Sequence, residues 1–274
     1  MRPLDAVRDA ERQLRVAGVP DARTDAELLV AHVLGAPRSA LHARSGYLDL
    51  AQLAALRTLV ERRRAREPLQ HILGHWGFRR LTLGVDGRAL VPRPETEVVV
   101  ERCIALLARV DAPRVLDVGT GSGAIALALA DERPDAHIVG VEVSPPALAL
   151  ARENAERTGL AERVELLEGD VLGTADGPFD LVVSNPPYIP EERLASLEPE
   201  VRDHDPREAL VASGLTEAVA RGAPDVLSPD GWLVLEVGDG QAHDVAELLR
   251  ALGYHDVRVT PDLAGIPRVV EGRP

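Results

Sequence analysis

The alternation of short apolar runs with amphipathic segments after Pro113 constrains the fold of this chain most strongly. The expected strands cover 114–118, 137–143, 164–168, 179–184, 231–237, 254–260 and 268–271. The expected helices cover 124–131, 146–157, 215–227 and 242–252. Strands and helices in this order are typical of an α/β domain, in which a mostly parallel sheet is covered by helices.

The last two expected strands are joined only by the short segment 261–267. A parallel crossover needs about a dozen residues or more, so we expect the last strand to be antiparallel. Seven strands with the last one reversed are the architecture of the Rossmann-like class I methyltransferases, and we predict this fold for the chain.

The first 74 residues show helical patterns instead. Apolar residues recur at helical spacing over 4–14 and 50–66, and Thr24-Asp25-Ala26-Glu27 has the form of a capping box that would open a helix over 26–34. The arginines at 62–64 are expected to form a solvated helix face. We predict a helical bundle domain over 1–74, a β-hairpin linker over 75–94 with its turn at 84–87, and a methyltransferase domain over 95–274.

Composition restricts the class of protein. The 274 residues carry a net charge of −13 and contain one cysteine, which excludes a disulfide framework and a thiolate metal cluster. No histidine pair has metal-ligand spacing, so we expect no metal. No apolar stretch is long enough for a membrane span, and no secretory signal opens the chain. We therefore expect a monomeric, cytoplasmic protein.

The charge is unevenly distributed. Residues 1–75 hold 12 arginines against 9 acidic residues, whereas the rest of the chain is strongly acidic. Nucleic-acid phosphates are bound by clustered basic charge. We therefore expect no direct nucleic-acid substrate and, instead, a basic protein partner.

A glycine-rich loop follows the first expected strand of the α/β region. Its residues are Asp117, Gly119, Thr120, Gly121, Ser122 and Gly123. Glycine lets such a turn adopt positive φ and lets a ligand lie against bare backbone. The loop also satisfies a dinucleotide-binding pattern, but its third glycine and Asp117 favour S-adenosyl-L-methionine, which has no pyrophosphate. Asp117 is expected to face the ammonium group of that ligand.

Two further strand ends are expected to complete the cofactor site. Glu142 closes the second strand, where an acidic side chain can accept hydrogen bonds from both ribose hydroxyls. Asp170 and Val171 follow the third strand and are expected to flank the adenine ring, with Asp170 accepting from the adenine amino group.

The tetrapeptide Asn185-Pro186-Pro187-Tyr188 follows the fourth expected strand, and its position is therefore the carboxyl edge of the sheet. Asn185 offers an amide oxygen as acceptor, the two prolines remove N–H donors, and Tyr188 adds a flat aromatic face. This set suits a planar –NH2 group. It is characteristic of methyltransferases that act on amide or exocyclic amino nitrogens.

Together these motifs resemble the HemK-type release factor glutamine methyltransferases. The resemblance covers nearly the whole chain. Besides the glycine loop and the tetrapeptide, it includes segments 68–74, 91–97, 200–210 and 262–270. Of these, Val91-Pro92-Arg93-Pro94-Glu95-Thr96-Glu97 is the most specific, because it is close to the linker signature of the family.

The resemblance implies an activity, a cofactor and a partner. The substrate would be the glutamine of a Gly-Gly-Gln motif in bacterial peptide chain release factors, and the helical domain would help to hold that protein. The methyl donor would be S-adenosyl-L-methionine. The Asn185 side-chain oxygen and the Pro186 carbonyl would accept from the glutamine amide, with Pro187 and Tyr188 completing the substrate site.

Two alternatives stay open. One keeps the chemistry and changes the substrate to adenine in DNA or guanine in ribosomal RNA. The other is a release-factor or ribosome binding module that has lost catalysis. The acidic catalytic half and segment 91–97 count against the first, and the intact loop, Glu142 and tetrapeptide count against the second.

Overall fold

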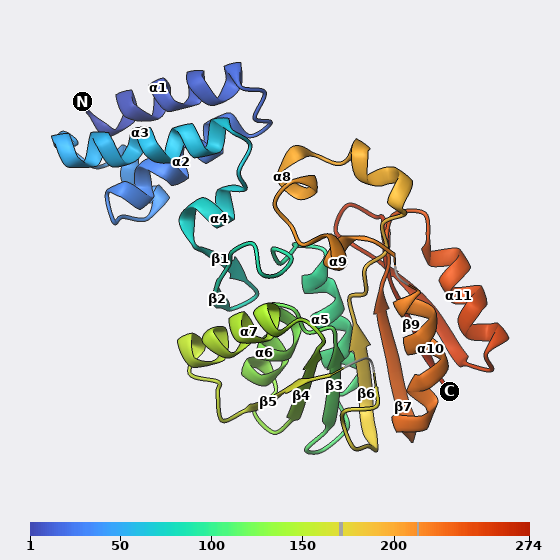
Figure 1. The fold of residues 1–274 in the computed structure, drawn as a ribbon. Helices are drawn as coiled ribbons and strands as arrows, with labels where there is room; N and C mark the ends of the chain where they lie inside the picture. The colour runs from blue at the N-terminus through green and yellow to red at the C-terminus, as the bar shows by residue number, and fades with distance from the viewer. Residues whose placement is uncertain (170–171, 213) are drawn as a thin grey trace. The chain divides into compact units, whose positions relative to one another are not determined.

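The computed structural model describes residues 1–169, 172–212 and 214–274. The chain forms two compact units: Met1–Gly74 with Glu198–His204, and His75–Leu197 with Asp205–Pro274 (Figure 1). The predicted three-part division at 74 and 94 remains a prediction. No helix in the described ranges is both long and apolar enough to cross a membrane.

The first unit is helical. It contains α1 (Pro3–Val16), α2 (Ala22–Val33), η1 (Arg38–His42), α3 (Leu50–Arg64), α4 (Leu69–Leu73) and α8 (Pro199–Arg202). The predicted capping box at Thr24 is wrong, because α2 begins at Ala22 and Thr24 lies inside it. The Glu27 carboxylate binds Arg23 and Arg38, both at 2.6 Å, instead of a backbone N–H.

The prediction of a solvated arginine face is wrong for Arg63. This side chain is buried and binds Asp25 and Glu200, each at 2.7 Å. Arg66 adds a bidentate pair to Glu200, with both contacts at 2.6 Å. Burial raises the pKa of Glu200, but the hydrogen bonds from Arg66 and Arg63 outweigh it and lower the pKa to about 2. These ion pairs hold α8 to the rest of the helical unit.

The second unit opens with a hairpin of β1 (His75–Phe78) and β2 (Leu81–Gly84). The predicted turn at 84–87 is wrong, because the chain reverses at Arg79 and Arg80. Tertiary contacts select this turn: Arg79 has a φ of 53°, donates its N–H to Glu97 at 2.9 Å and binds Glu132 through two contacts of 2.8 Å. Gly84 instead exchanges backbone hydrogen bonds with the Asn154 amide.

The main sheet has the strand order β5-β4-β3-β6-β7-β9-β8. The strands are β3 (Arg114–Val118), β4 (His137–Glu142), β5 (Val164–Glu168), β6 (Phe179–Ser184), β7 (Leu227–Glu236), β8 (His255–Pro261) and β9 (Pro267–Arg273). The neighbouring strands β5, β4, β3, β6 and β7 pair in parallel, in that order across the sheet. Strand β9 is antiparallel to both β7 and β8. The predicted seven-stranded sheet with the last strand reversed is confirmed.

Helices cover both faces of this sheet (Figure 1). Their bounds are α5 (Thr96–Leu106), α6 (Ala124–Glu132), α7 (Pro145–Thr158), α10 (Leu215–Val226) and α11 (Ala242–Ala251). The short helices η2 (Glu191–Ser196) and α9 (Arg207–Leu210) lie in the connection between β6 and α10. Neighbouring strand residues point to opposite faces. Val115 therefore packs with the apolar residues of α5 and α6, whereas Leu116 packs with those of α10 and α11.

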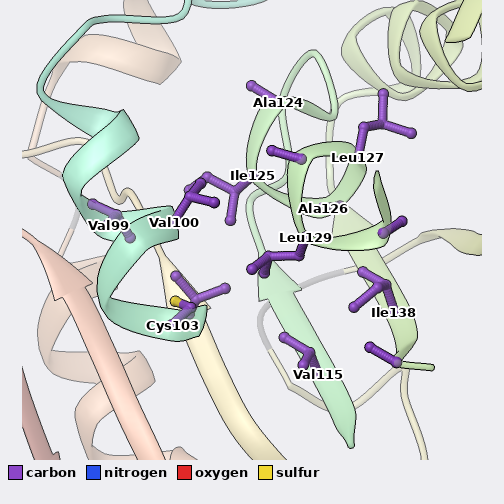
Figure 2. Packing of buried hydrophobic residues seen from close by; sticks show 14 of the residues in the cluster. Val99, Val100, Cys103, Val115, Ala124, Ile125, Ala126, Leu127, Leu129 and Ile138 are labelled. Carbon is purple, nitrogen blue, oxygen red and sulfur yellow. The ribbon is translucent and has the colours of Figure 1, made fainter. Parts of the chain in front are cut away.

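The core beneath α5 and α6 consists mainly of aliphatic side chains, to which Phe78 and the partly buried Trp232 add two aromatic rings. Val99, Val100 and Cys103 of α5 lie beside Ile125 and Leu129 of α6 (Figure 2). Cys103 is fully buried, and desolvation raises the pKa of its thiol well above the usual value. Alanine, valine, leucine and isoleucine make up most of this buried cluster.

The register of the parallel strands aligns their carboxyl ends. Val118 of β3 is paired with Val141 of β4 and Ser184 of β6, and Ser184 is paired with Leu235 of β7. The next residue on each strand is Gly119, Glu142, Asn185 and Glu236, respectively. These four residues consequently form one row across the edge of the sheet.

One buried carboxylate lies within the sheet just before that row. Asp117 of β3 is 1% exposed, and its Oδ2 accepts from the Thr120 hydroxyl at 2.6 Å and from the Ala126 N–H at 3.2 Å. Its Oδ1 has no hydrogen-bond partner in the described part of the chain. Desolvation raises the pKa of Asp117 to about 7 from the ordinary value of 3.8, although both hydrogen bonds lower it.

We expect Asp117→Asn to flatten the pH dependence of stability. Because the folded pKa of Asp117 is raised, its favourable contribution is present in acid and disappears as the pH rises from 3.8 through about 7. Between pH 5 and pH 8 the wild-type protein should lose about 2 kcal/mol more free energy of unfolding than the variant. Urea denaturation at both pH values measures this, and equal losses would contradict it.

We also expect Leu181→Ala to destabilise the second unit. Leu181 is fully buried in the central strand β6, so its truncation should lower the free energy of unfolding by about 2–5 kcal/mol. Leu263 is fully exposed and provides the matched control, because Leu263→Ala should change stability by less than about 0.5 kcal/mol. Chemical denaturation of both variants checks the pair.

Candidate active site

A cavity of about 610 Å³ lies at the carboxyl edge of β3, β4 and β6. Seven of the predicted site residues line it: Gly119, Thr120, Gly121, Ser122, Glu142, Asn185 and Pro187. Its other walls come from the segment before α5, the start of α7 and the segment 206–211. The structure therefore brings the predicted cofactor loop and the predicted transfer motif into one cavity.

The glycine loop owes its shape to backbone hydrogen bonds from the neighbouring strand. The N–H groups of Gly119 and Thr120 both donate to the Val141 carbonyl, at 2.9 and 3.0 Å. Gly119 and Gly121 have φ values of 72° and 58°, and a Cβ added to Gly119 would meet no atom within 4 Å. The glycines thus present bare backbone to the cavity in a conformation that other residues adopt only with strain.

Gly123 has a different role from that of the other two glycines. It has a φ of 83°, precedes α6 and does not line the cavity. A Cβ at this position would lie 3.1 Å from Leu127 and 3.4 Å from Ala151. Gly123 therefore permits the close approach of α6 and α7 rather than direct access to a ligand.

Glu142 ties the glycine loop to the end of β4. One carboxylate oxygen accepts from the Gly121 N–H at 2.8 Å, and the other accepts from the Ser144 N–H at 2.9 Å. Each oxygen keeps a second lone pair, and the side chain lines the cavity. The carboxylate is thus fixed in place and can still accept hydrogen bonds from a ligand.

Other predicted cofactor residues are placed differently. The Asp117 side chain lies beneath the glycine loop and is not part of the cavity wall. Its predicted contact with the ligand remains a prediction, and its contacts here support the loop through Thr120. Asp170 and Val171 lie outside the described residues, while the preceding Gly169 lines the cavity.

Gln241, which is not part of the cavity wall, fixes the end of the tetrapeptide. Asn185 and Pro187 line the cavity, whereas Pro186 is buried and, like Tyr188, is not part of the wall. Gln241 donates to the Tyr188 carbonyl at 2.9 Å and accepts from the Gly238 N–H at 3.0 Å. Desolvation raises the pKa of Tyr188 to about 12, so its hydroxyl stays protonated at neutral pH.

Thr96 and Glu236 are site residues that the sequence analysis missed. Asn185 Nδ2 donates to the Thr96 hydroxyl at 3.4 Å. Glu236 is 1% exposed and lies next to Asn185 at the edge of the sheet, because the preceding residues Leu235 and Ser184 are paired. A usable signal was present in the sequence, because Glu236 ends an apolar strand in the same way as Glu142.

Arg93 lines the cavity and also forms an ion pair with the segment that follows α8. Its guanidinium binds Asp205 at 2.6 Å. Two other arginines on the cavity wall are also paired: Arg88 binds Asp86 at 2.8 Å and Glu153 at 2.6 Å, and Arg207 binds Glu191. In the described part of the chain, no group of His, Cys, Asp and Glu side chains is arranged to hold a metal ion.

Comparison with known proteins identifies the family. Residues 5–74 match the PrmC N-terminal domain, and residues 110–261 match a methyltransferase domain. The release factor glutamine methyltransferase of Geobacter sulfurreducens is 47% identical over 262 residues, which are 93% of this chain and 91% of that protein. The enzyme of the same name from Deinococcus radiodurans is 46% identical over 281 residues, covering 100% and 99% of the two chains.

A solved structure supports the fold independently. A methyltransferase from Pyrococcus furiosus superposes with a TM-score of 0.51 at 21% identity, covering 70% of this chain and 88% of that one. At this identity the similarity establishes the fold only. The sequence matches, which extend over both units, establish more: this chain belongs to the family of release factor glutamine methyltransferases.

Proposed function

We propose that this protein transfers a methyl group from S-adenosyl-L-methionine to the side-chain amide nitrogen, N5, of the glutamine in the Gly-Gly-Gln motif of bacterial peptide chain release factors. The observation that carries the proposal is the position of Asn185, whose amide borders the same cavity as the glycine loop. The release factor is thus a protein partner, and its role in translation makes the cytoplasm the expected place of the reaction.

The residues around the cavity fit S-adenosyl-L-methionine. Gly119 and Gly121 expose backbone where a Cβ would narrow the cavity, and Glu142 holds fixed acceptor oxygens suited to ribose hydroxyls. Val143 is exposed and also lines the cavity, where it offers an apolar surface for a ring. When bound, this group supplies a methyl carbon made electrophilic by a positively charged sulfur.

The residues of the chain must position a weak nucleophile, the amide nitrogen of the substrate glutamine. The lone pair of an amide nitrogen is delocalised into its carbonyl, so the nitrogen reacts slowly unless it is held in line with the methyl carbon. The Asn185 side-chain oxygen and the Pro186 carbonyl are the proposed acceptors for the two N–H hydrogens of the glutamine. They orient the nitrogen and favour the positive charge that it gains on attack.

The cavity wall argues against a nucleic-acid substrate. Arg88, Arg93 and Arg207 are the arginines that line it, and each is paired with a carboxylate of the same unit. Guanidinium groups already engaged in this way are poorly available for phosphate. The paired arginines therefore favour a protein substrate over DNA or ribosomal RNA.

A labelling experiment tests the substrate. The protein is incubated with methyl-labelled S-adenosyl-L-methionine and, separately, with a purified bacterial release factor, duplex DNA and ribosomal RNA. We expect label only on the release factor, and none when the glutamine of its Gly-Gly-Gln motif is replaced by alanine. Label confined to nucleic acid would support the amino-methyltransferase alternative, and no label on any substrate would support a binding module.

We expect Asn185→Ala to remove an acceptor used in the transition state. The turnover number kcat for the release factor should fall by about 100-fold or more, while the affinity for S-adenosyl-L-methionine should change by less than about threefold, because Glu142 and the glycine loop are untouched. Steady-state kinetics and calorimetry measure the two quantities. Unchanged turnover would contradict the assigned role.

A further inference from the structure

The Asn185 side chain has two polar neighbours on one side, Thr96, which also lines the cavity, and Glu236, which does not. Its Nδ2 donates to the Thr96 hydroxyl at 3.4 Å, and Glu236 lies beside it, because the preceding residues Ser184 and Leu235 are paired across β6 and β7. In the described part of the chain, no protein hydrogen bond uses Asn185 Oδ1 as an acceptor. The nitrogen end of the amide is therefore anchored, and the oxygen end is available to the cavity.

The chemical nature of Glu236 decides which end of the amide it holds. A carboxylate only accepts hydrogen bonds, whereas an amide has a donating nitrogen and an accepting oxygen. If the Asn185 side chain were flipped, its oxygen would face the Glu236 carboxylate and the two acceptors would repel each other. When it is ionised, Glu236 thus selects one of two orientations that are otherwise almost identical in shape.

Thr96 completes this arrangement. Its hydroxyl oxygen accepts from Asn185 Nδ2, so its own hydrogen can be donated to the Glu236 carboxylate, whose pKa Thr96 lowers. Thr96 is 4% exposed at the start of α5, and Glu236 is 1% exposed at the end of β7. Two rigid elements from different parts of the chain thereby meet at the one side chain proposed to touch the substrate.

Burying the Glu236 carboxylate lowers the stability of the fold, which suggests that this residue is kept for its function. Glu236 Oε2 has no hydrogen-bond partner among the described residues. Desolvation raises the pKa of Glu236 to about 7, and the hydrogen bonds from Thr96 and Asn185 together with the charge of Arg268 lower it, while the charge of Glu95 raises it. A leucine in this place would avoid an unpaired buried acceptor.

We propose that Glu236 and Thr96 are positioning residues that hold the Asn185 amide with its oxygen towards the glutamine substrate. This inference rests on the proposed function and deepens it. Glu236 does not line the cavity, and Thr96, which does, is assigned to Asn185 and not to the substrate or the methyl donor. Each acts through Asn185 by disfavouring the flipped amide. In that orientation the NH2 group of Asn185, and not its oxygen, would face the N–H groups of the substrate.

The test compares two substitutions with matched controls. Glu236→Gln replaces the acceptor-only group by one that can also donate, and Thr96→Val removes the hydroxyl while keeping the shape. We expect kcat for the release factor to fall by about 10- to 100-fold for Glu236→Gln and by about 3- to 10-fold for Thr96→Val. Thr96→Ser keeps the hydroxyl and should retain near wild-type kcat.

Glu271→Gln controls for the loss of a buried charge. Glu271 is fully buried on β9 and binds Arg102 at 2.7 Å, so this variant should be less stable but should keep its kcat when folded. The affinity for S-adenosyl-L-methionine should stay within about threefold of wild type in all four variants. A loss of kcat in Glu271→Gln equal to that in Glu236→Gln would overturn the inference.

A second readout does not depend on activity. The side-chain NH2 signals of Asn185 in a 15N-labelled sample, assigned by their absence in Asn185→Ala, should shift with pH in the wild type as Glu236 ionises. In Glu236→Gln this titration should disappear. Glu95, Arg268 and Tyr188 are the other ionisable groups that interact with Glu236, and Glu95→Gln should leave the titration in place.

The outcomes separate this inference from the proposed function. No methylation of the release factor by the wild-type protein would defeat the proposed function itself. Methylation by the wild type together with full kcat in both Glu236→Gln and Thr96→Val would defeat only the positioning role. The positioning role would also be overturned if the Asn185 signals titrated identically in wild type and Glu236→Gln.

Discussion

The parallel pairing of β3 with β4 and β6, continued to β7, is the constraint on which the site depends. Its register places Gly119, Glu142, Asn185 and Glu236 at the same level, one residue beyond paired strand positions. A shift of one residue in any pair would turn the corresponding side chain to the other face of the sheet. The strand register alone therefore fixes the level and the face of the sheet at which these four residues lie.

Three carboxylates near this edge show how environment separates the roles of similar groups. Asp117 is buried beneath the glycine loop and supports Thr120. Glu142 reaches the cavity with each oxygen already fixed by one backbone N–H. Glu236 is buried behind Asn185, where its interactions with Thr96 and Asn185 only partly offset desolvation. Of the three, Glu142 is the one that lines the cavity.

Much of this organisation could be predicted because it depends on local patterns. The strands β3, β5 and β6 have the predicted bounds, since each is an apolar run ended by glycine or polar residues. The glycine loop and Asn185 could be identified because they follow strands at the carboxyl edge of the sheet, where α/β folds bind ligands. The errors at Thr24, Arg63 and the hairpin turn share a cause: in each case a partner distant in sequence, or an ion pair, outweighed the local signal.

The sequence by itself determined the α/β order, the reversed last strand, the family and the residues offered to cofactor and substrate, because hydrophobic period, loop length and motif chemistry are local properties. Only the tertiary structure decided how those residues are supported. It placed Asp117 under the loop rather than in the cavity, buried Arg63 against Asp25 and Glu200, and brought Thr96 and Glu236 to Asn185. Such contacts join segments far apart in the chain, and no spacing along the sequence encodes their distances.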